Sequence, residues 1–581
     1  MSEEKVLTGK PSIDKPWMKY YPPIMLQMIQ IPGCTIRKYL EDRCPGMDVP
    51  AIHYYQREVL WSEIFEETEQ LARAFRAAGV KEGDKIPVYL RLVPEFIPIL
   101  LAAEKIGAAV VCRDNTPEEN VEAAAKAQAK LIVAHSFLSE DEKNMYMAVG
   151  VEKFVLISPL RRTSRKNMPY HIKACLDTYY NSVPAYGNEC IDYDDFLASG
   201  KMYAGQVDAA EDITRPLFCA YTSGSTGPSK QVIHSAETML GIVCQMNFYG
   251  GASEFRPTWM VTCLPPALVA VVVAMVIMPL ASNKLLIMDP FVFERDVDLE
   301  LMYYKPNNWP LIPMFIEYVM RNGRMTKDYD LSHLVAAGAG SEALNNNQLK
   351  RAQQFLLDHN CKIRFTTGYG CSEAGSNVSL PMAPKPLGNG NVGVPMPLAT
   401  ISIFKPGTQE ELTYNTPGEI CLTGPGIMLG YDNPEATAKS LQRHADGKVW
   451  LHLGDIGMMD EDGVIYTMTR GASPRYGGGD LAIQTLENKL ADADVPGIDD
   501  EFFVIIPDDE HEGYFIPYLY VVLKNGYTIA DIKDAVDACL DDYMKPVDII
   551  EVEERPFFHF KTNRIGLTRE LQAMRAAKKQ G

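Results

Sequence analysis

Apolar segments of strand length alternate with amphipathic helical segments along the first third of the chain, and this rhythm limits the folds open to it. A helical pattern lies within Tyr55–Ala78, a strand is predicted at Lys85–Leu92, a helix at Glu95–Gly107 and a strand at Ala108–Arg113. Parallel strands need long crossover connections, which are usually helices. The order therefore predicts parallel sheets flanked by helices, an α/β fold.

The same rhythm returns in the middle of the chain. Strands are predicted at Lys284–Asp289, Leu334–Ala337 and Lys362–Thr366, and helices at Asp298–Tyr304 and Asn345–His359. The segment Val392–Tyr466 instead carries short alternating runs that glycine and proline interrupt. Such runs are typical of a small antiparallel or barrel-like sheet.

The last part of the chain predicts a separate small domain. A glycine-rich turn, Gly477-Gly478-Gly479, follows Arg470. Two helices, Leu481–Ala491 and Ile529–Leu540, and two strands, Phe502–Ile506 and Tyr518–Leu523, come after it. A chain of 581 residues is expected to divide into more than one domain. We expect a large α/β domain over residues 1–469 and a small, mobile α+β domain over residues 470–581.

Composition excludes some classes of function. The 56 basic and 75 acidic residues give a formal charge of −19, which argues against a general nucleic-acid binder. The 12 cysteines include no CxxC pair, so a disulfide framework or zinc cluster is not expected. The polar start at Met1-Ser2-Glu3-Glu4-Lys5 is unlike a signal peptide. These features together favour the reducing cytoplasm.

One uncharged stretch, Trp259–Ala281, could be mistaken for a membrane span. Its wholly apolar part, Ala267–Met278, lies between Pro265-Pro266 and Pro279 and holds 12 residues. A membrane helix needs about 20. We therefore predict a buried helix and no membrane span.

The segment Tyr221-Thr222-Ser223-Gly224-Ser225-Thr226-Gly227, followed by Lys230, has the composition of a phosphate-binding loop. Glycine lets the backbone approach an anion closely, hydroxyl and N–H groups donate to phosphate oxygens, and the lysine adds positive charge. It is not a Walker A loop, because Ser229 stands where the second glycine is needed. On composition alone, a polar surface turn is an equal alternative.

Later motifs favour the phosphate-binding alternative. The loop and these motifs, in order, resemble the signature of the adenylate-forming superfamily, which includes acyl-CoA synthetases, luciferases and peptide-synthetase adenylation domains. The matching segments are the loop itself, His234, Gly340-Ser341-Glu342-Ala343-Leu344, Thr367-Gly368-Tyr369-Gly370-Cys371-Ser372-Glu373, Pro417-Gly418-Glu419, Gly430-Tyr431, Gly454-Asp455, Asp460-Glu461-Asp462-Gly463 and Arg470.

The resemblance implies ATP, Mg²⁺ and coenzyme A as ligands and assigns residues to each. It implies nucleotide contacts by Thr222, Ser223, Gly224, Ser225, Thr226, Gly227, Gly340, Ser341, Glu342, Tyr369, Gly370, Ser372, Asp455 and Arg470. It implies Mg²⁺ binding by Thr226 and Glu373, and catalytic roles for Lys230 and Glu373. Tyr369 would stack on adenine, and Asp455 would accept hydrogen bonds from the ribose hydroxyls.

The resemblance also implies a reaction of two steps. A carboxylate attacks the α-phosphorus of ATP and gives an acyl-adenylate and pyrophosphate, and a thiol, usually that of coenzyme A, then expels AMP. Charge neutralisation and in-line placement carry the first step. The small domain would move between the two steps.

The C-terminal sequence departs from the family pattern. The family has a lysine that bridges the carboxylate and the α-phosphate, and Gly566 stands there when Lys561-Thr562 and Arg569 are aligned without a gap. A two-residue gap puts Arg564 at that place, and we predict that Arg564 or Lys561 substitutes. At the hinge, Ala472 replaces the usual Asp or Lys, and Gly479 is the sole candidate for coenzyme A contact.

The acyl pocket also departs from the pattern. Ala267 and Leu268 replace an aromatic–histidine pair, and with Gly368 they are the predicted substrate contacts. No acidic residue lies between Glu254 and Asp289, so the ammonium of an α-amino acid would lack a partner. We expect an AMP-forming acid–thiol ligase for a fatty or aryl acid. The alternatives are a ligase that loads a carrier protein or an amine, and a catalytically degenerate nucleotide-binding protein.

Overall fold

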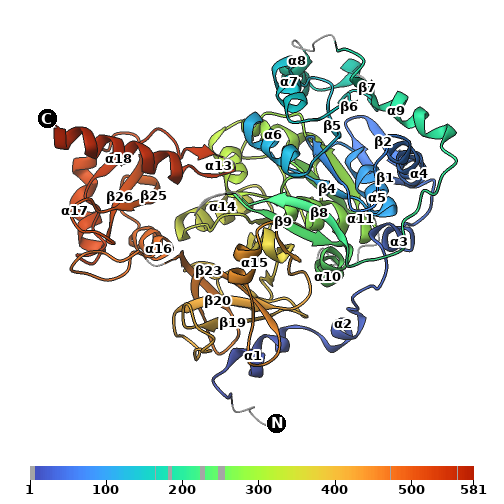
Figure 1. The fold of residues 1–581 in the computed structure, drawn as a ribbon. Coiled ribbons are helices and arrows are strands. Elements are labelled where there is room, and N and C mark those ends of the chain that lie inside the picture. The colour runs from blue at the N-terminus through green and yellow to red at the C-terminus, as the bar shows by residue number, and fades with distance from the viewer. Residues whose placement is uncertain are drawn as a thin grey trace.

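The computed structural model describes residues 7–114, 116–163, 165–180, 186–222, 229–246, 256–471, 473–558 and 560–580. Within these ranges two large sheets, a small antiparallel sheet and a C-terminal unit follow one another along the chain (Figure 1). A helix with the length and apolarity needed to cross a bilayer is absent from these ranges.

An eight-stranded sheet lies toward the upper right of Figure 1. Its strands, in spatial order, are β21 (Gly430–Tyr431), β9 (Gln231–Ser235), β8 (Pro216–Tyr221), β4 (Ala109–Val111), β3 (Lys85–Tyr89), β5 (Leu131–His135), β6 (Lys153–Ile157) and β7 (Cys190–Asp192). Every pair from β8 to β7 is parallel, whereas β9 and β21 extend the sheet in antiparallel fashion.

A seven-stranded sheet carries the middle part of the chain. Its strands, in spatial order, are β14 (Thr366–Thr367), β13 (Ala336–Ala339), β12 (Asn308–Leu311), β10 (Thr258–Thr262), β11 (Leu285–Asp289), β1 (Pro50–Tyr54) and β2 (Arg57–Leu60). All pairs except β1–β2 are parallel, as the alternation predicted. The carboxyl ends of β10, β12, β13 and β14 therefore share one edge.

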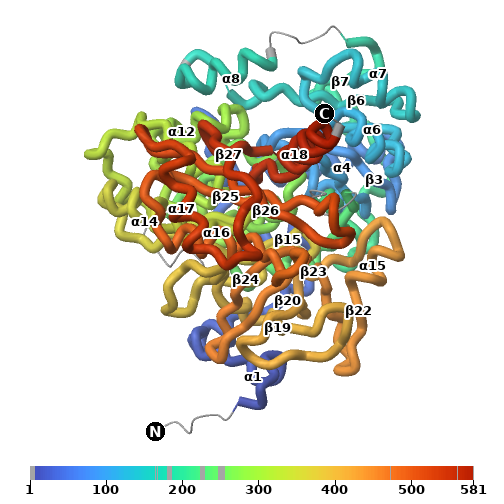
Figure 2. Tube along the Cα trace, turned by 90° about the vertical axis from the view of Figure 1, so that its left-hand side faces the viewer, coloured from blue at the N-terminus to red at the C-terminus, as the bar shows by residue number. Residues whose placement is uncertain are grey.

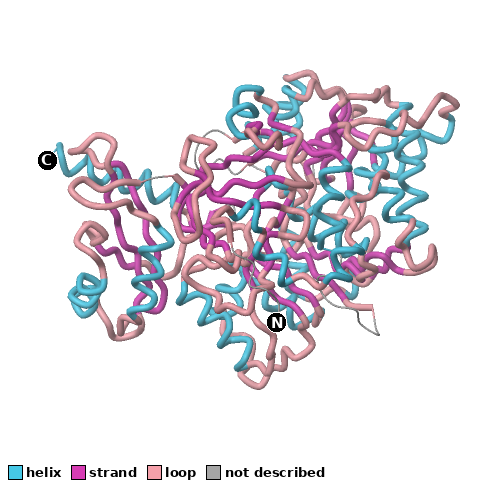
Figure 3. The backbone as a smooth tube through the Cα atoms, turned by 90° about the horizontal axis from the view of Figure 1, so that it is seen from below, coloured by secondary structure: helices cyan, strands magenta, loops and turns pink. Residues whose placement is uncertain are grey.

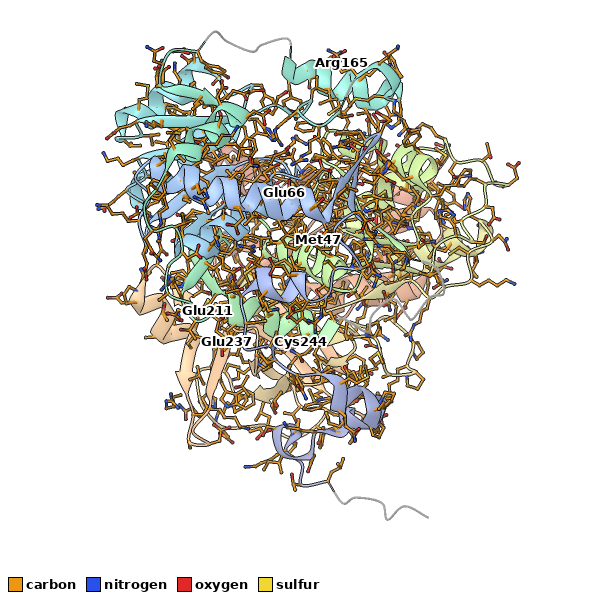
Figure 4. The ribbon with its side chains drawn as sticks, turned by 90° about the vertical axis from the view of Figure 1, so that its right-hand side faces the viewer. Met47, Glu66, Arg165, Glu211, Glu237 and Cys244 are labelled. Carbon is orange, nitrogen blue, oxygen red and sulfur yellow. The ribbon has the colours of Figure 1, made fainter. Side chains whose placement is uncertain are left out.

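Helices cover both sheets and fill the space between them. Their bounds are α3 (Ile36–Glu41), α4 (Trp61–Ala77), α5 (Phe96–Ile106), α6 (Pro117–Lys126), α7 (Glu140–Ala148), α8 (Tyr170–Tyr180), α9 (Tyr193–Ser199), α10 (Ala236–Met246), α12 (Val297–Tyr304), α13 (Pro313–Arg321) and α14 (Asn346–Asp358). Helices α5 and α10 are buried on nearly every side, which fits their apolar sequences. Figure 4 shows the face opposite the C-terminal unit, with Glu66 labelled on α4 and Cys244 on α10.

The uncharged stretch is a core element, as predicted. It forms η4, a π-helix at Val271–Ile277, and continues into α11 (Met278–Ala281). Val272 and Val273 are fully buried in the main hydrophobic cluster, which joins residues of both large sheets. The helix begins four residues later than the predicted Ala267.

Three sequence predictions of element bounds were inaccurate. The pattern in Tyr55–Ala78 gives a helix only from Trp61, because Arg57–Leu60 pairs with β1. The strand predicted at Leu334–Ala337 lies two residues later. The strand predicted at Lys362–Thr366 is limited to Thr366–Thr367.

The predicted antiparallel part is confirmed as a five-stranded sheet. It consists of β19 (Thr400–Phe404), β20 (Gly418–Thr423), β23 (Val449–Met459), β22 (Leu441–Arg443) and β24 (Ile465–Arg470), and all its pairs are antiparallel. Ile401, Ile420 and Leu451 belong to its own apolar cluster. The sheet is joined to the eight-stranded one in sequence by β21 and the short helix α15 (Pro434–Ser440).

The C-terminal unit has a three-stranded sheet and its own apolar clusters. Its elements are α16 (Ile483–Ala493), β25 (Ile498–Pro507), β26 (Phe515–Leu523), α17 (Ile529–Cys539), β27 (Ile549–Glu551) and α18 (Arg564–Gln580). Leu486, Phe503 and Ile532 pack on one face of the sheet, and Phe502 and Leu571 on the other. Figure 2 shows this unit in front of the larger part, and Figure 3 shows it to one side.

Candidate functional site

Two of the predicted nucleotide segments follow neighbouring parallel strands. Gly340 and Ser341 come directly after β13, and Gly368 and Tyr369 come directly after β14. These strands are paired in register, Ala339 opposite Thr367. Because parallel strands end at the same edge, the fold brings the segments together there. Ligands of open parallel sheets commonly bind at this edge.

The backbone of these segments has features that a site requires. Ser341 has a φ of 80°, in the left-handed region that favours glycine. At Gly370, in β15 (Gly370–Cys371), an added Cβ would lie 2.1 Å from the Ser376 carbonyl oxygen. Any side chain at 370 would therefore break the pairing of β15 with β16 (Ser376–Asn377), which fixes the segment after Tyr369.

Tyr369, Asp455 and Arg470 form a connected group. The Tyr369 hydroxyl donates to Asp455 Oδ2 at 2.5 Å, and Arg470 Nε lies 3.5 Å from Asp455 Oδ1. Asp455 and Arg470 face each other on β23 and β24. Burial raises the pKa of Asp455, and the nearby Arg470 and Tyr369 oppose that rise. The arrangement places a carboxylate beside an aromatic ring, as a ribose and its base would require.

The motif Pro417-Gly418-Glu419 supports this carboxylate. Glu419 Oε1 accepts a hydrogen bond from the Gly454 N–H at 3.0 Å, and His452 Nδ1 lies 3.1 Å from Glu419 Oε2. The bond holds the backbone immediately before Asp455. The sequence predicted the motif, but not this role.

Glu373 is buried at the start of the short helix η6 (Ser372–Ala374). The Tyr431 hydroxyl donates to its Oε1 at 2.7 Å. Among the described residues, Glu373 Oε2 has no hydrogen-bond donor. Carboxylate oxygens are the ligands that Mg²⁺ prefers, so this oxygen fits a hard cation that also binds phosphate.

The ordered ends of the predicted phosphate loop lie beside Glu373. The Lys230 ammonium lies 4.9 Å from the centre of the Tyr431 ring. The Lys230 N–H donates to Thr222 Oγ1 at 3.0 Å and closes the base of the loop. The predicted residues Ser223, Gly224, Ser225, Thr226 and Gly227 lie outside the described residues.

His234 joins the strand after the loop to the Glu373 segment. Its Nε2 donates to the Ser372 carbonyl oxygen at 2.8 Å, while its Nδ1 lies 3.1 Å from Thr238 Oγ1. Burial lowers the pKa of His234 to about 4, so the ring is neutral at physiological pH. The contact makes His234 a positioning residue for the backbone at Ser372.

Glu342 contacts the C-terminal unit. Its Oε2 accepts from both the N–H and the hydroxyl of Thr562, at 3.0 and 3.1 Å, and its Oε1 pairs with Arg564. Arg564 also donates to Glu487 Oε1 at 2.7 Å and to the Phe503 carbonyl oxygen at 3.1 Å. The partners of Glu342 and Arg564 were not predicted from the sequence, because they come from segments far apart along the chain.

The predicted substrate residues lie at the carboxyl end of β10. Ala267 and Leu268 follow this strand, are half-buried and pack against the main apolar cluster. Gly368, at the end of β14, lies close to the Ser379 backbone: an added Cβ would be 3.3 Å from the Ser379 carbonyl oxygen. These positions share the strand edge with the nucleotide segments.

At the hinge, Gly479 lies against an aromatic ring. An added Cβ at Gly479 would lie 3.1 Å from the Tyr543 ring. Ala472 lies outside the described residues.

The chain is similar to several curated ligases. It is 26% identical over 516 residues to a 4-coumarate–CoA ligase from Humulus lupulus, and the match covers 86% of each chain. A 4-coumarate–CoA ligase from Arabidopsis thaliana is 26% identical over 437 residues, with 72% of this chain and 71% of the relative covered.

Solved structures share the fold. ATP-bound MatB from Rhodopseudomonas palustris has a TM-score of 0.75 at 20% identity, covering 92% of this chain and 98% of that one. The anthranilate CoA ligase AuaEII with anthranoyl-AMP has a TM-score of 0.74 at 17% identity, covering 94% and 98%. The sequence model for the AMP-binding enzyme matches residues 42–432, more than half of the chain. The chain therefore belongs to the AMP-binding enzyme family.

Proposed function

We propose that this enzyme activates a hydrophobic carboxylic acid with ATP and transfers the acyl group to coenzyme A. In the first step a carboxylate oxygen bonds to the α-phosphorus, and the bond to the pyrophosphate oxygen breaks. In the second step the coenzyme A thiolate bonds to the acyl carbon and AMP leaves. The observation that carries the proposal is that Tyr369–Asp455–Arg470 and Lys230–Tyr431–Glu373 occur in one family fold.

The proposed roles follow from the chemistry of each group. Asp455 accepts from ribose hydroxyls, Tyr369 stacks on the base, and Lys230 with Arg470 neutralises phosphate charge. The proposed nucleotide contacts also include Thr222, Ser223, Gly224, Ser225, Thr226, Gly227, Gly340, Ser341, Gly370 and Ser372. Glu342 is better explained as a docking residue, because Thr562 and Arg564 occupy both its oxygens.

Glu373 and Thr226 are the proposed holders of Mg²⁺. The ion would neutralise phosphate charge when bound. Glu373 is held for this task by the Tyr431 hydroxyl, which leaves Oε2 for the cation. Removal of divalent ions should abolish acyl-adenylate formation.

The acid is proposed to be an aryl acid, with a fatty acid as the second class. Similar proteins are titled ligases for 4-coumarate, anthranilate and o-succinylbenzoate. Ala267 and Leu268 offer apolar contact and no charge. The region after residue 470 would move between the steps as a small domain, with Gly479 close to the coenzyme A path.

The test separates this function from its alternatives. The purified enzyme is incubated with ATP, Mg²⁺, labelled pyrophosphate and a panel of cinnamic, benzoic and fatty acids. Exchange of label into ATP with at least one acid, and a thioester on adding coenzyme A, are the expected results. Exchange without a thioester would favour a carrier-protein or amine acceptor. ATP binding without exchange by any acid would favour a degenerate nucleotide-binding protein.

A further inference from the structure

The residue that should supply the last positive charge of the first step is absent from its usual place. Gly566 stands there, in the first turn of α18. An added Cβ at Gly566 would lie 2.6 Å from Asn563 Nδ2, and the Gly566 N–H donates to Asn563 Oδ1 at 3.0 Å. The Asn563 side chain, which caps this helix turn, therefore fills the space that a side chain at 566 would need.

A hairpin just before α18 reaches the large part of the molecule. Strands β28 (Phe557–Phe558) and β29 (Lys561–Thr562) form it. The Phe557 ring meets the Tyr318 ring of α13 edge-on at 5.8 Å. On β29, Thr562 donates twice to Glu342. These contacts fix the backbone on both sides of Lys561.

Arg564 is unavailable to a phosphate in this arrangement. Its guanidinium donates to Glu342, to Glu487 Oε1 and to the Phe503 carbonyl oxygen. Although burial opposes it, the pairing with Arg564 lowers the pKa of Glu342, so the pair is ionised. Arg564 thus joins the large and small parts through two carboxylates, and its donors face protein acceptors.

We propose that Lys561 supplies the positive charge between the substrate carboxylate and the α-phosphate, while Arg564 acts as a positioning residue through Glu342. The proposal rests on the proposed function. Lys561 is half-buried beside Glu342, and its charge interacts with those of Asp455, Glu373 and Arg470. It is therefore directed toward the ribose and phosphate groups of the site.

The electrostatic setting suits that task. Two anions must approach each other in the first step, and a fixed cation between them stabilises the charge that builds up. Burial and Arg470 lower the pKa of Lys561, whereas Glu342, Asp455 and Glu373 oppose that shift. Lys561 stays protonated throughout: the new P–O bond forms with the carboxylate electrons, and the old one leaves with pyrophosphate.

The test measures the two half-reactions separately in the full-length enzyme. Lys561→Ala should reduce acid-dependent pyrophosphate exchange at least about 100-fold, as loss of one preorganised donor does elsewhere. Thioester formation from supplied acyl-adenylate and coenzyme A should stay within about threefold of the parent, which also shows that the variant is folded. Lys533→Ala, on the exposed face of α17, is the matched control and should change neither rate.

Lys561→Arg provides a second readout. It should restore part of the exchange and move the alkaline limb of its pH profile upward, because arginine stays charged to higher pH. Exchange by Lys561→Ala equal to the parent, or an equal loss in both half-reactions, would overturn the role of Lys561. A parent enzyme without exchange for any acid would instead overturn the proposed function, and the Lys561 role with it.

The Arg564 part is tested by a double-mutant cycle. Glu342→Gln and Arg564→Gln should each reduce exchange, and the double variant should lose no more than the worse single one, because the residues act as a pair. Full additivity of the two losses would overturn the positioning role.

Discussion

At the scale of single residues, the Asp455 carboxylate depends on its two neighbours. Burial raises its pKa, and Arg470 and Tyr369 oppose the rise. The ionised form must accept from the ribose hydroxyls, so ATP use should fail as pH falls through this pKa. Arg470→Gln removes the nearby charge, and the acidic limb of kcat/KM for ATP should move to higher pH. The measurement is pyrophosphate exchange across the pH range.

Tyr369→Phe provides a related residue-scale prediction. It keeps the ring and removes the 2.5 Å hydrogen bond to Asp455. A hydrogen bond to a charged group contributes about 1.5–3 kcal/mol, so kcat/KM for ATP should fall roughly tenfold or more. Coenzyme A saturation in the second half-reaction serves as the control and should be unaffected. An unchanged kcat/KM for ATP would separate Tyr369 from the nucleotide site.

Residue identities could be predicted from the sequence more easily than their partners. Asp455, Glu373 and Tyr369 were identified by motif, and the structure brings them to one strand edge. The partners of Arg564 could not be predicted, since Glu342 lies 222 positions away along the chain. Choosing between Lys561 and Arg564 requires knowing which one is already paired.

At the scale of elements, the start of α14 both begins a helix and docks another part of the chain. Asn345 caps the helix with Gln348 in a reciprocal pair, and its Nδ2 also donates to the Glu501 carbonyl oxygen at 3.1 Å. Asn347 Nδ2 donates to the Asp499 carbonyl oxygen at 3.1 Å and to Glu501 Oε2 at 2.9 Å. The sequence predicted this helix correctly, but a cap signal says nothing of the remaining donors.

Asn347→Ala should therefore loosen the C-terminal unit without disturbing α14. Two lost hydrogen bonds would weaken docking by about 1–2 kcal/mol, roughly tenfold in the equilibrium. Limited proteolysis should then cut faster near residues 473–480. Gln354→Ala, on the exposed side of the same helix, is the control and should leave the cleavage rate unchanged. Equal rates for Asn347→Ala and the parent would contradict the docking role.

At the scale of the whole molecule, the two parts meet through buried charges. Arg351 of α14 pairs with Glu317 of α13 at 2.8 Å and lies 3.4 Å from Asp500 of β25. Asp500 in turn pairs with Arg555 at 2.8 Å. Buried charges are costly unless paired, so such an interface holds one geometry closely and separates readily into hydrated halves. That is the behaviour expected of a domain that must dock and release.

Glu501 makes this docking sensitive to pH. Burial, together with the neighbouring Asp500, raises its pKa from 4.5 to about 8, while Asn347, Arg555 and Arg351 oppose the rise. A released domain would expose Glu501 to water and return it to its ordinary pKa, so docking takes up a proton. The contribution to docking is fully present below pH 4.5 and is lost as the pH rises through about 8. Small-angle scattering should show a more extended enzyme at about pH 9 than at about pH 6. Glu501→Gln, which is always uncharged, should remove that difference, and a difference of the same size in Glu501→Gln would assign the pH response to another group.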